Sequence, residues 1–149
     1  MNLIANRLFA PESNTRKTDI ALFLLRLWLG LTMILNHGLS KLVNFGEMSP
    51  KFFDLFGIGS AVSLALAVFA EVICSALLTA GLLTRFAASS LCFNMLVAFA
   101  MVHEMRLSGE RSGELAFMYL AGFATLLIVG PGRYSADGLL FSKPTKPAG

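Results

Sequence analysis

The chain has 149 residues, of which 56% are hydrophobic and only 14% charged, and its mean hydropathy is +0.70. Soluble domains are about 45–50% apolar and about 25% charged, so this composition argues against a soluble enzyme and rules out a disordered chain. The net charge of +3 is small and scattered, which argues against a nucleic-acid-binding protein and favours the lipid bilayer as the environment of the chain.

Four apolar stretches predict four transmembrane helices. Residues 1–19 come first as a polar segment without the apolar core of a signal peptide. The predicted spans then follow over residues 20–37, 58–83, 85–103 and 113–130. The fourth is short for a crossing, which takes about 20 residues, so it must borrow flanking residues or lie in a thinned bilayer. The predicted fold class is therefore all-α, an integral membrane four-helix bundle over residues 20–140, with a flexible tail over 141–149.

Glycine and proline residues mark the predicted helix ends. Gly38 is typical of a helix C-terminus and predicts the end of the first helix. Gly81 predicts the end of the second, and Thr84 is placed to cap the third. Together they predict a tight antiparallel hairpin. Pro131 predicts the end of the fourth helix.

The longest connection, residues 43–57, contains a second helix signal. Ser49 and Pro50 resemble an N-cap followed by proline in the first turn. Three aromatic residues follow, Phe52, Phe53 and Phe56. We expect a short helix lying in the membrane interface between the first and second spans. The alternative is an ordinary loop whose aromatic residues pack on the bundle.

The distribution of basic residues predicts the orientation. One side of the membrane collects seven Lys and Arg residues, and the other side collects four. The larger group comprises Arg7, Arg16, Lys17, Arg85, Arg133, Lys143 and Lys146, and the smaller one Lys41, Lys51, Arg106 and Arg111. Both termini are therefore expected in the cytoplasm.

Two charged residues lie deep in the predicted spans. Arg26 interrupts the first and Glu71 the second. A charge at a helix centre costs about 2.5–3.5 kcal/mol on insertion scales, so such residues usually face the bundle interior and find a partner. The predicted depths nearly coincide, and we expect an Arg26–Glu71 ion pair between the first two helices. The pair has two interpretations, a functional site or a contact that only fixes the helix register.

Helical periodicity groups further polar and small residues with this pair. At 100° per residue, Gly30, His37 and Lys41 share the face of Arg26 on the first helix. Every fourth residue of the second helix is small or polar, which gives a stripe made of Ser63, Ala67, Glu71, Ser75 and Thr79. On the third helix, Asn94 and His103 are nine residues apart and predicted to point about 180° away from each other, so both cannot face one pocket.

Polar residues also gather at the predicted outer surface. His37 and Lys41 lie there with His103, Glu104 and Glu114. Such a layer is suited to proton transfer, or it consists only of solvated helix ends. The spacing matches no metal-binding motif, so no metal site is predicted.

Several segments, taken in order, resemble the DoxX family. They are RLWLG at 26–30, HGLSKL at 37–42, AE at 70–71, GLLTR at 81–85, NMLVA at 94–98, ELAFMYL at 114–120 and GPGRYS at 130–135. The resemblance covers residues 20–140. It implies a multi-pass protein of the bacterial inner membrane with four helices. The family name is linked to small membrane subunits of quinone-coupled sulfur or respiratory oxidoreductases, while relatives in the wider superfamily look like assembly or trafficking factors.

Two functional hypotheses follow. The first is a subunit of a quinone-linked membrane oxidoreductase, not catalytic alone, with no intrinsic cofactor and electrons supplied by a partner. Its catalytic candidates are Arg26, Glu71 and His37. Its candidate ligand-binding residues are Arg26, Gly30, His37, Lys41, Glu71, Ser75, His103 and Glu114. The alternative is a non-catalytic membrane scaffold or assembly factor that binds partner proteins or a second copy of itself. A solute or proton channel would require an oligomer.

Overall fold

The computed structural model describes residues 15–141, and every regular element within them is helical. The first long helix comprises α2 (Thr15–Met33), the π-helical segment η1 (Ile34–Gly38) and α3 (Leu39–Val43). The second comprises α5 (Ser60–Val68), the π segment η3 (Phe69–Cys74) and α6 (Ser75–Ala80). The third comprises α7 (Thr84–Val97) and the π segment η4 (Ala98–Val102), and the fourth is α8 (Glu114–Val129). The shorter elements are α4 (Phe45–Met48), the 3-10 turn η2 (Ser49–Lys51) and α9 (Ala136–Phe141).

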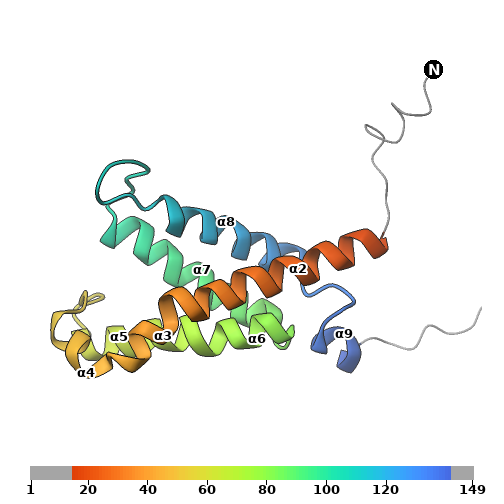
Figure 1. The fold of residues 1–149 in the computed structure, drawn as a ribbon, viewed down its shortest axis with the longest axis horizontal. Helices are drawn as coiled ribbons and strands as arrows, with labels where there is room; N and C mark the ends of the chain where they lie inside the picture. Colours follow the sequence, from red (N-terminus) through yellow and green to blue (C-terminus); the bar gives the residue numbers. More distant parts are fainter. Residues whose placement is uncertain (1–14, 142–149) are drawn as a thin grey trace, which may run out of the picture.

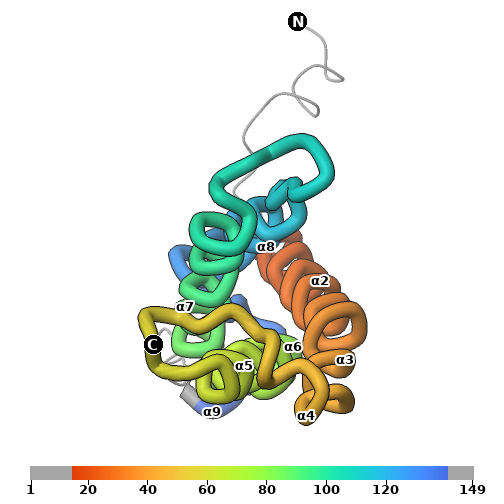
Figure 2. The backbone as a smooth tube through the Cα atoms, turned by 90° about the vertical axis from the view of Figure 1, so that its left-hand side faces the viewer, coloured from red at the N-terminus to blue at the C-terminus, as the bar shows by residue number. Residues whose placement is uncertain are grey.

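The long helices run side by side and form a bundle. They follow the long axis of the molecule, with α4 at one end and α9 at the other (Figure 1). A view along the bundle shows α2, α6, α7 and α8 arranged as a ring (Figure 2). Neighbours in this ring pack on each other, most extensively α7 on α8 and α2 on α6. Buried alanines such as Ala87 and Ala88 let α7 approach its neighbours closely.

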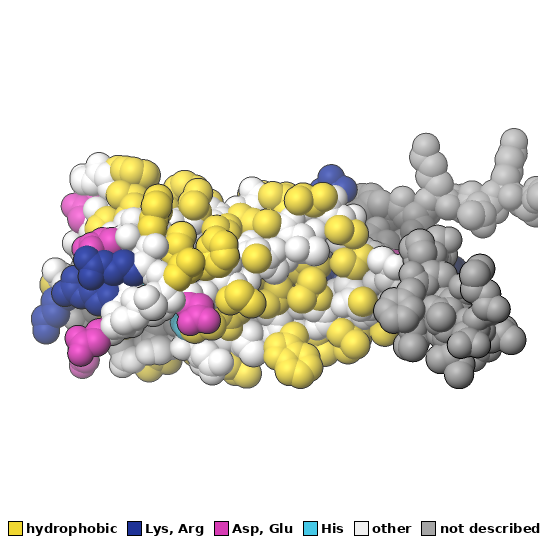
Figure 3. Space-filling model, turned by 90° about the horizontal axis from the view of Figure 1, so that it is seen from above, with side chains coloured by type: hydrophobic (Ala, Val, Ile, Leu, Met, Phe, Trp, Pro, Cys, Tyr) yellow, Lys and Arg dark blue, Asp and Glu magenta, His cyan; other side chains and the backbone are white. Residues whose placement is uncertain are grey.

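Three of the helices are long and apolar enough to cross a membrane, Thr15–Val43, Ser60–Ala80 and Thr84–Val102. The fourth, Glu114–Val129, is apolar but shorter, as its sequence predicted. Hydrophobic side chains cover the middle of the face seen in Figure 3, and charged side chains gather at the end that carries α4. The all-helical fold class is thereby confirmed. The predicted segment before residue 15, the tail from 142, and Arg7, Lys143 and Lys146 lie outside the described residues.

The first helix does not end at Gly38, so that prediction is wrong. Gly38 is buried within η1, and the helix continues to Val43. A Cβ atom at Gly38 would lie 2.9 Å from the carbonyl oxygen of Glu71 and 2.7 Å from a methyl carbon of Val72. The glycine therefore serves the close approach of two helix backbones and does not terminate the helix.

The predicted turn at Gly81 is confirmed, but the predicted cap is wrong. Gly81 ends α6 in the left-handed conformation, with a φ of 71°. Thr84 makes no side-chain capping bond. Instead, the backbone amides of Leu83 and Thr84 donate to the two carboxylate oxygens of Asp137, each at 2.8 Å. The cap therefore comes from α9, at a separation in sequence that the search for a local capping residue does not cover.

The predicted short helix between the first two spans is confirmed, although it lies earlier than expected. It consists of α4 and η2, and Pro50 lies in the first turn of η2. Residues 52–59, which we call the strap, are irregular and cross the α4 end of the bundle (Figure 2). The strap is held where the amide of Leu55 donates to the Ser63 hydroxyl at 2.9 Å. Phe53 and Phe56 are exposed, whereas Leu55 is buried.

Candidate functional site

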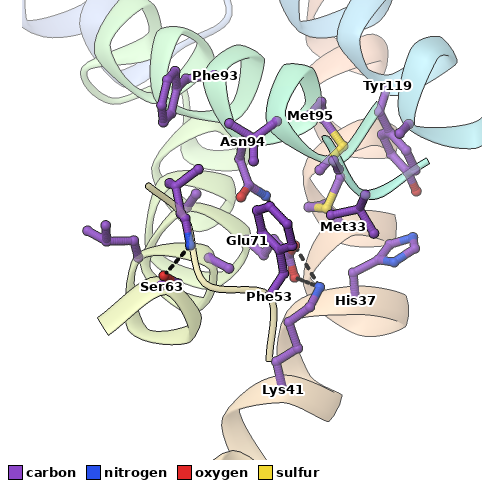
Figure 4. A pocket seen from close by; sticks show the side chains of 18 of the residues that line it. Met33, His37, Lys41, Phe53, Ser63, Glu71, Phe93, Asn94, Met95 and Tyr119 are labelled. Atoms are coloured by element: carbon purple, nitrogen blue, oxygen red, sulfur yellow. Dashed lines mark hydrogen bonds and ion pairs between the residues drawn. The ribbon is translucent and has the colours of Figure 1, made fainter. Parts of the chain in front are cut away.

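A cavity of about 1170 Å³ lies in the half of the bundle that carries α4. All four long helices contribute to its wall, and the strap contributes Phe52, Phe53 and Leu55. Its surface is mostly apolar, and Figure 4 shows the polar side chains that face it. A largely apolar cavity with a few convergent polar groups is typical of a small-molecule binding site.

The polar centre of the cavity is a group of three side chains, Lys41, Glu71 and Asn94, which we call the Glu71 cluster. The Lys41 ammonium donates to the two oxygens of the buried Glu71 carboxylate at 2.7 and 2.5 Å. The Asn94 amide donates to one of the same oxygens at 3.1 Å (Figure 4). The carboxylate thus has a countercharge and three hydrogen bonds, which is what a buried charge needs in order to be tolerated.

The geometry of the first helix explains why Lys41 reaches Glu71. Because the helix continues past Gly38, Lys41 projects from α3 one turn beyond the point where Gly38 touches the Glu71 backbone. Asn94 approaches from α7, which packs on η3. Three helices therefore meet at one carboxylate.

All three π segments of the described chain border this cavity. His37 comes from η1, Glu71 from η3, and Ala98 and Val102 from η4. A π turn adds a residue to an α-helix and is frequent at functional sites. Their convergence supports a binding function for this cavity, independently of its polarity.

Aromatic side chains form the wall toward α8. The imidazole of His37 meets the ring of Tyr119 edge to face, with ring centroids 5.6 Å apart. Tyr119 in turn stacks with Phe123 at 5.8 Å. His103 lies at the cavity margin, where its Nδ1 is 3.2 Å from the carbonyl oxygen of Arg111. The cavity wall thus contains the His37 and Tyr119 rings beside the Glu71 cluster.

The prediction that Asn94 and His103 cannot face one pocket is wrong, because both line this cavity. The prediction assumed a regular α-helix between them. The segment η4 lies in that interval, and its wider turns advance the side chains by a smaller angle per residue. The two residues consequently lie closer in direction than α-helical periodicity indicates.

The predicted Arg26–Glu71 ion pair is also wrong. Arg26 is completely buried near the α9 end of the bundle, where its guanidinium donates to the carbonyl oxygens of Leu78 and Tyr134. It fills the space beside Gly81, where a Cβ atom would lie 1.9 Å from a guanidinium nitrogen. Arg26 therefore satisfies a carbonyl in the last turn of α6 and fixes the connection between α8 and α9.

The register of the first two helices accounts for this error. Gly30 lies against Ser75 and Thr79, whereas Gly38 lies against Glu71. Glu71 is thus level with Gly38, about 18 Å from Arg26 at 1.5 Å per residue. The prediction calculated the depths of Arg26 and Glu71 from the predicted helix ends, and in the structure the first helix begins and ends at other residues.

The remaining predicted site residues divide between the cavity and other places. His37, Lys41, Glu71 and His103 line the cavity. Gly30 and Ser75 are buried where α2 meets α6, and Glu114 is exposed at the start of α8. Sequence reasoning overlooked Tyr119, and a hydroxyl-bearing ring inside an apolar span was the signal that pointed to it.

Comparison with known proteins gives a consistent result. The family model described as DoxX matches residues 21–104, which include His37 and the whole Glu71 cluster. The chain is also similar to an uncharacterized membrane protein, Rv3486, of Mycobacterium tuberculosis (strain ATCC 25618 / H37Rv). The two are 32% identical over an alignment that covers 81% of this chain and 82% of that protein. No solved structure matches this chain.

Proposed function

The chain belongs to the DoxX family of membrane proteins, and we propose that it is a quinone-binding subunit of an oxidoreductase system in the bacterial inner membrane. One observation carries the proposal: a buried glutamate, paired with a half-buried lysine and asparagine, lies in the wall of a large, mostly apolar cavity. The proposal places the α9 end of the bundle in the cytoplasm, in accordance with the distribution of basic residues.

The residues present fit a quinone. Its ring is flat and apolar, and its carbonyl oxygens accept hydrogen bonds. Asn94 and Lys41 supply donors at the Glu71 cluster, and the aromatic wall beside His37 suits the face of a ring. The cavity, at about 1170 Å³, has room for a ring and part of a tail. When bound, a quinone supplies the capacity to accept electrons and protons.

The residues of the chain orient the ligand and handle protons. Lys41 and Asn94 would fix a carbonyl oxygen of the ligand through their remaining N–H groups, and the carboxylate of Glu71 would accept a proton released at that oxygen. His37, one turn before Lys41 on the first helix, provides a second proton-exchanging group in the cavity wall. Electrons come from a partner subunit, so this chain is not catalytic alone.

The experiment is a binding titration of the purified chain in lipid nanodiscs with a short-tailed benzoquinone and a short-tailed naphthoquinone. We expect at least one of them to bind saturably, as measured by calorimetry. Asn94→Leu should raise its dissociation constant about tenfold, because it removes one hydrogen-bond donor of the site. Arg26→Met is the control and should leave the dissociation constant unchanged, since Arg26 lies outside the cavity.

A different outcome would refute the quinone proposal. If neither quinone binds the folded protein saturably, or if Arg26→Met weakens binding as much as Asn94→Leu, the cavity is not the site. Absence of binding together with co-purification of a stable partner would favour the scaffold or assembly-factor hypothesis.

A further inference from the structure

The cavity opens sideways between α5 and α7. Four of the exposed residues in its lining come from the second helix and α7. Leu66 and Phe69 are 49% and 42% exposed on the side of the second helix, and Phe93 is 53% exposed on α7, next to the exposed Ser89. Side chains that line a cavity and are half exposed lie at its opening. We call this opening the α5–α7 portal and define it by these four residues.

Helix packing explains why the opening exists. In the half of the bundle that carries α4, α5 packs mainly on η2 and α3, whereas α7 packs mainly on η3 and α8. The second helix therefore contacts α7 mainly through η3, and α5 itself packs on other elements. The small side chain of Ser89 leaves the opening unobstructed on its α7 side.

The portal lies at the depth of the Glu71 cluster. Phe69 precedes Glu71 by two residues, and Phe93 precedes Asn94 by one. Figure 4 shows Asn94 pointing toward Glu71 while Phe93, on the same helix, stands to one side. Both helices are apolar spans at this level, so the portal faces the hydrocarbon region of the bilayer.

The other way out of the cavity has a different chemistry. Toward the α4 end, the lining residues include Lys51, His103 and Ser112. The strap crosses this end of the bundle (Figure 2), and its Phe52 and Leu55 line the cavity. A polar ligand atom would be tolerated at that margin, which also carries the exposed apolar side chain of Val102. The portal, whose lining has no charged side chain, is an exit that a hydrophobic chain can use.

We propose that the α5–α7 portal admits a membrane-dissolved amphiphile sideways from the bilayer, with its polar head at the Glu71 cluster and its hydrophobic chain left in the portal. This inference rests on the proposed function, in which the amphiphile is a quinone and its chain is the isoprenoid tail. Leu66, Phe69 and Phe93 contact the chain, whereas Lys41 and Asn94 contact the head. The portal thus selects for ligands that carry a tail.

The test compares one benzoquinone with a long isoprenoid tail and the same ring without a tail, both titrated into nanodiscs. Ser89→Trp and Leu66→Trp each place a bulky ring in the portal without touching the Glu71 cluster. Leu96→Trp is the matched control, because Leu96 is exposed on the same helix but does not line the cavity. We expect the portal variants to raise the dissociation constant of the tailed ligand about tenfold to a hundredfold by overpacking. The tailless ligand and the control should change by less than about twofold, the scale of a surface substitution.

The possible results separate this inference from the function on which it rests. If the tailless ring binds and neither portal variant weakens the tailed ligand, the portal proposal is wrong while the quinone site stands. Equal weakening of both ligands also overturns it, because the tryptophan would then disturb the head site. If the tailless ring does not bind the unmodified protein, the quinone proposal fails and the portal proposal fails with it. Should Ser89→Trp not fold, the result with Leu66→Trp decides.

Discussion

Replacing Lys41 by methionine should destabilise the protein strongly. Glu71 is buried and accepts two of its three hydrogen bonds from Lys41, at 2.7 and 2.5 Å. Lys41→Met leaves a buried carboxylate with only the Asn94 amide. Removing one partner of a buried ion pair costs about 3–5 kcal/mol. The Lys41 side chain is 20% exposed, so water screens part of the interaction. We therefore expect a loss of about 3 kcal/mol in the free energy of unfolding, the lower end of that range.

The double variant Lys41→Met, Glu71→Met should recover more than half of this loss. Replacing both members of a buried pair by apolar groups of similar volume is often neutral, because the desolvation cost disappears with the charges. Lys51→Met is the matched control, since Lys51 also lines the cavity but is exposed on η2. It should change the free energy of unfolding by less than about 0.5 kcal/mol.

The assay is reversible unfolding in mixed micelles, with increasing denaturing detergent and helix content followed by circular dichroism. A loss below about 1 kcal/mol for Lys41→Met would show an interaction no stronger than an exposed ion pair. A double variant as unstable as the single one would show that the lysine acts through packing and not through the charge of Glu71. Either result would refute the reasoning.

Three further predictions concern the helix contacts and the α9 end. Gly38→Ala should cost about 1–3 kcal/mol in the same unfolding assay, because its Cβ would overpack the Glu71 backbone, whereas Gly46→Ala, with open space around it, should cost nothing. Equal effects would contradict the close helix approach. Arg26→Met should lower the free energy of unfolding by about 1–3 kcal/mol through its lost hydrogen bonds to carbonyl oxygens, while quinone binding is retained. Loss of quinone binding in a folded Arg26→Met protein would contradict the conclusion that Arg26 lies outside the binding site. Burial alone would raise the pKa of Asp137, but its hydrogen bonds from Thr84 and Leu83 and the charge of Arg26 outweigh burial and lower that pKa. Its stabilising effect is therefore complete above the unfolded value of about 3.9 and lost as the pH falls through the lowered pKa, and Asp137→Asn should flatten this part of a stability–pH curve. If Asp137→Asn leaves the stability–pH curve unchanged, the carboxylate of Asp137 is not the cause of the stability loss at low pH.

The helices were predictable because apolar length is a strong signal that needs no knowledge of packing. The sequence also singled out Lys41, His37 and Glu71, which line the cavity, since polar groups in or beside apolar spans are costly and stand out. Their pairing was not predictable. The pairing depends on the register of the first two helices. Gly38 sets that register by its contact with the Glu71 backbone, but in the sequence it is typical of a helix end.

The directions of side chains on the helices were the second feature that the sequence could not predict. The phase calculation assumed 100° per residue throughout, yet each of the first three long helices contains a π segment at the level of the cavity. No composition rule marks the residues of η4 as π-helical. The error for Asn94 and His103 followed directly, and the same wider turns help to form the cavity that these residues share.

The two buried charges of the bundle illustrate why burial alone does not identify a functional site. Arg26 is enclosed by the carbonyls of Leu78 and Tyr134 and by Gly81 and does not line the large cavity, so its hydrogen bonds serve to hold parts of the chain together. Glu71 has a countercharge and three hydrogen bonds, and its partners face a cavity into which a ligand could insert and compete for the same donors. The difference between them is accessible space next to the charge. It predicts that substitutions at Arg26 change stability alone, whereas Asn94→Leu changes ligand affinity while leaving the Lys41–Glu71 pair intact.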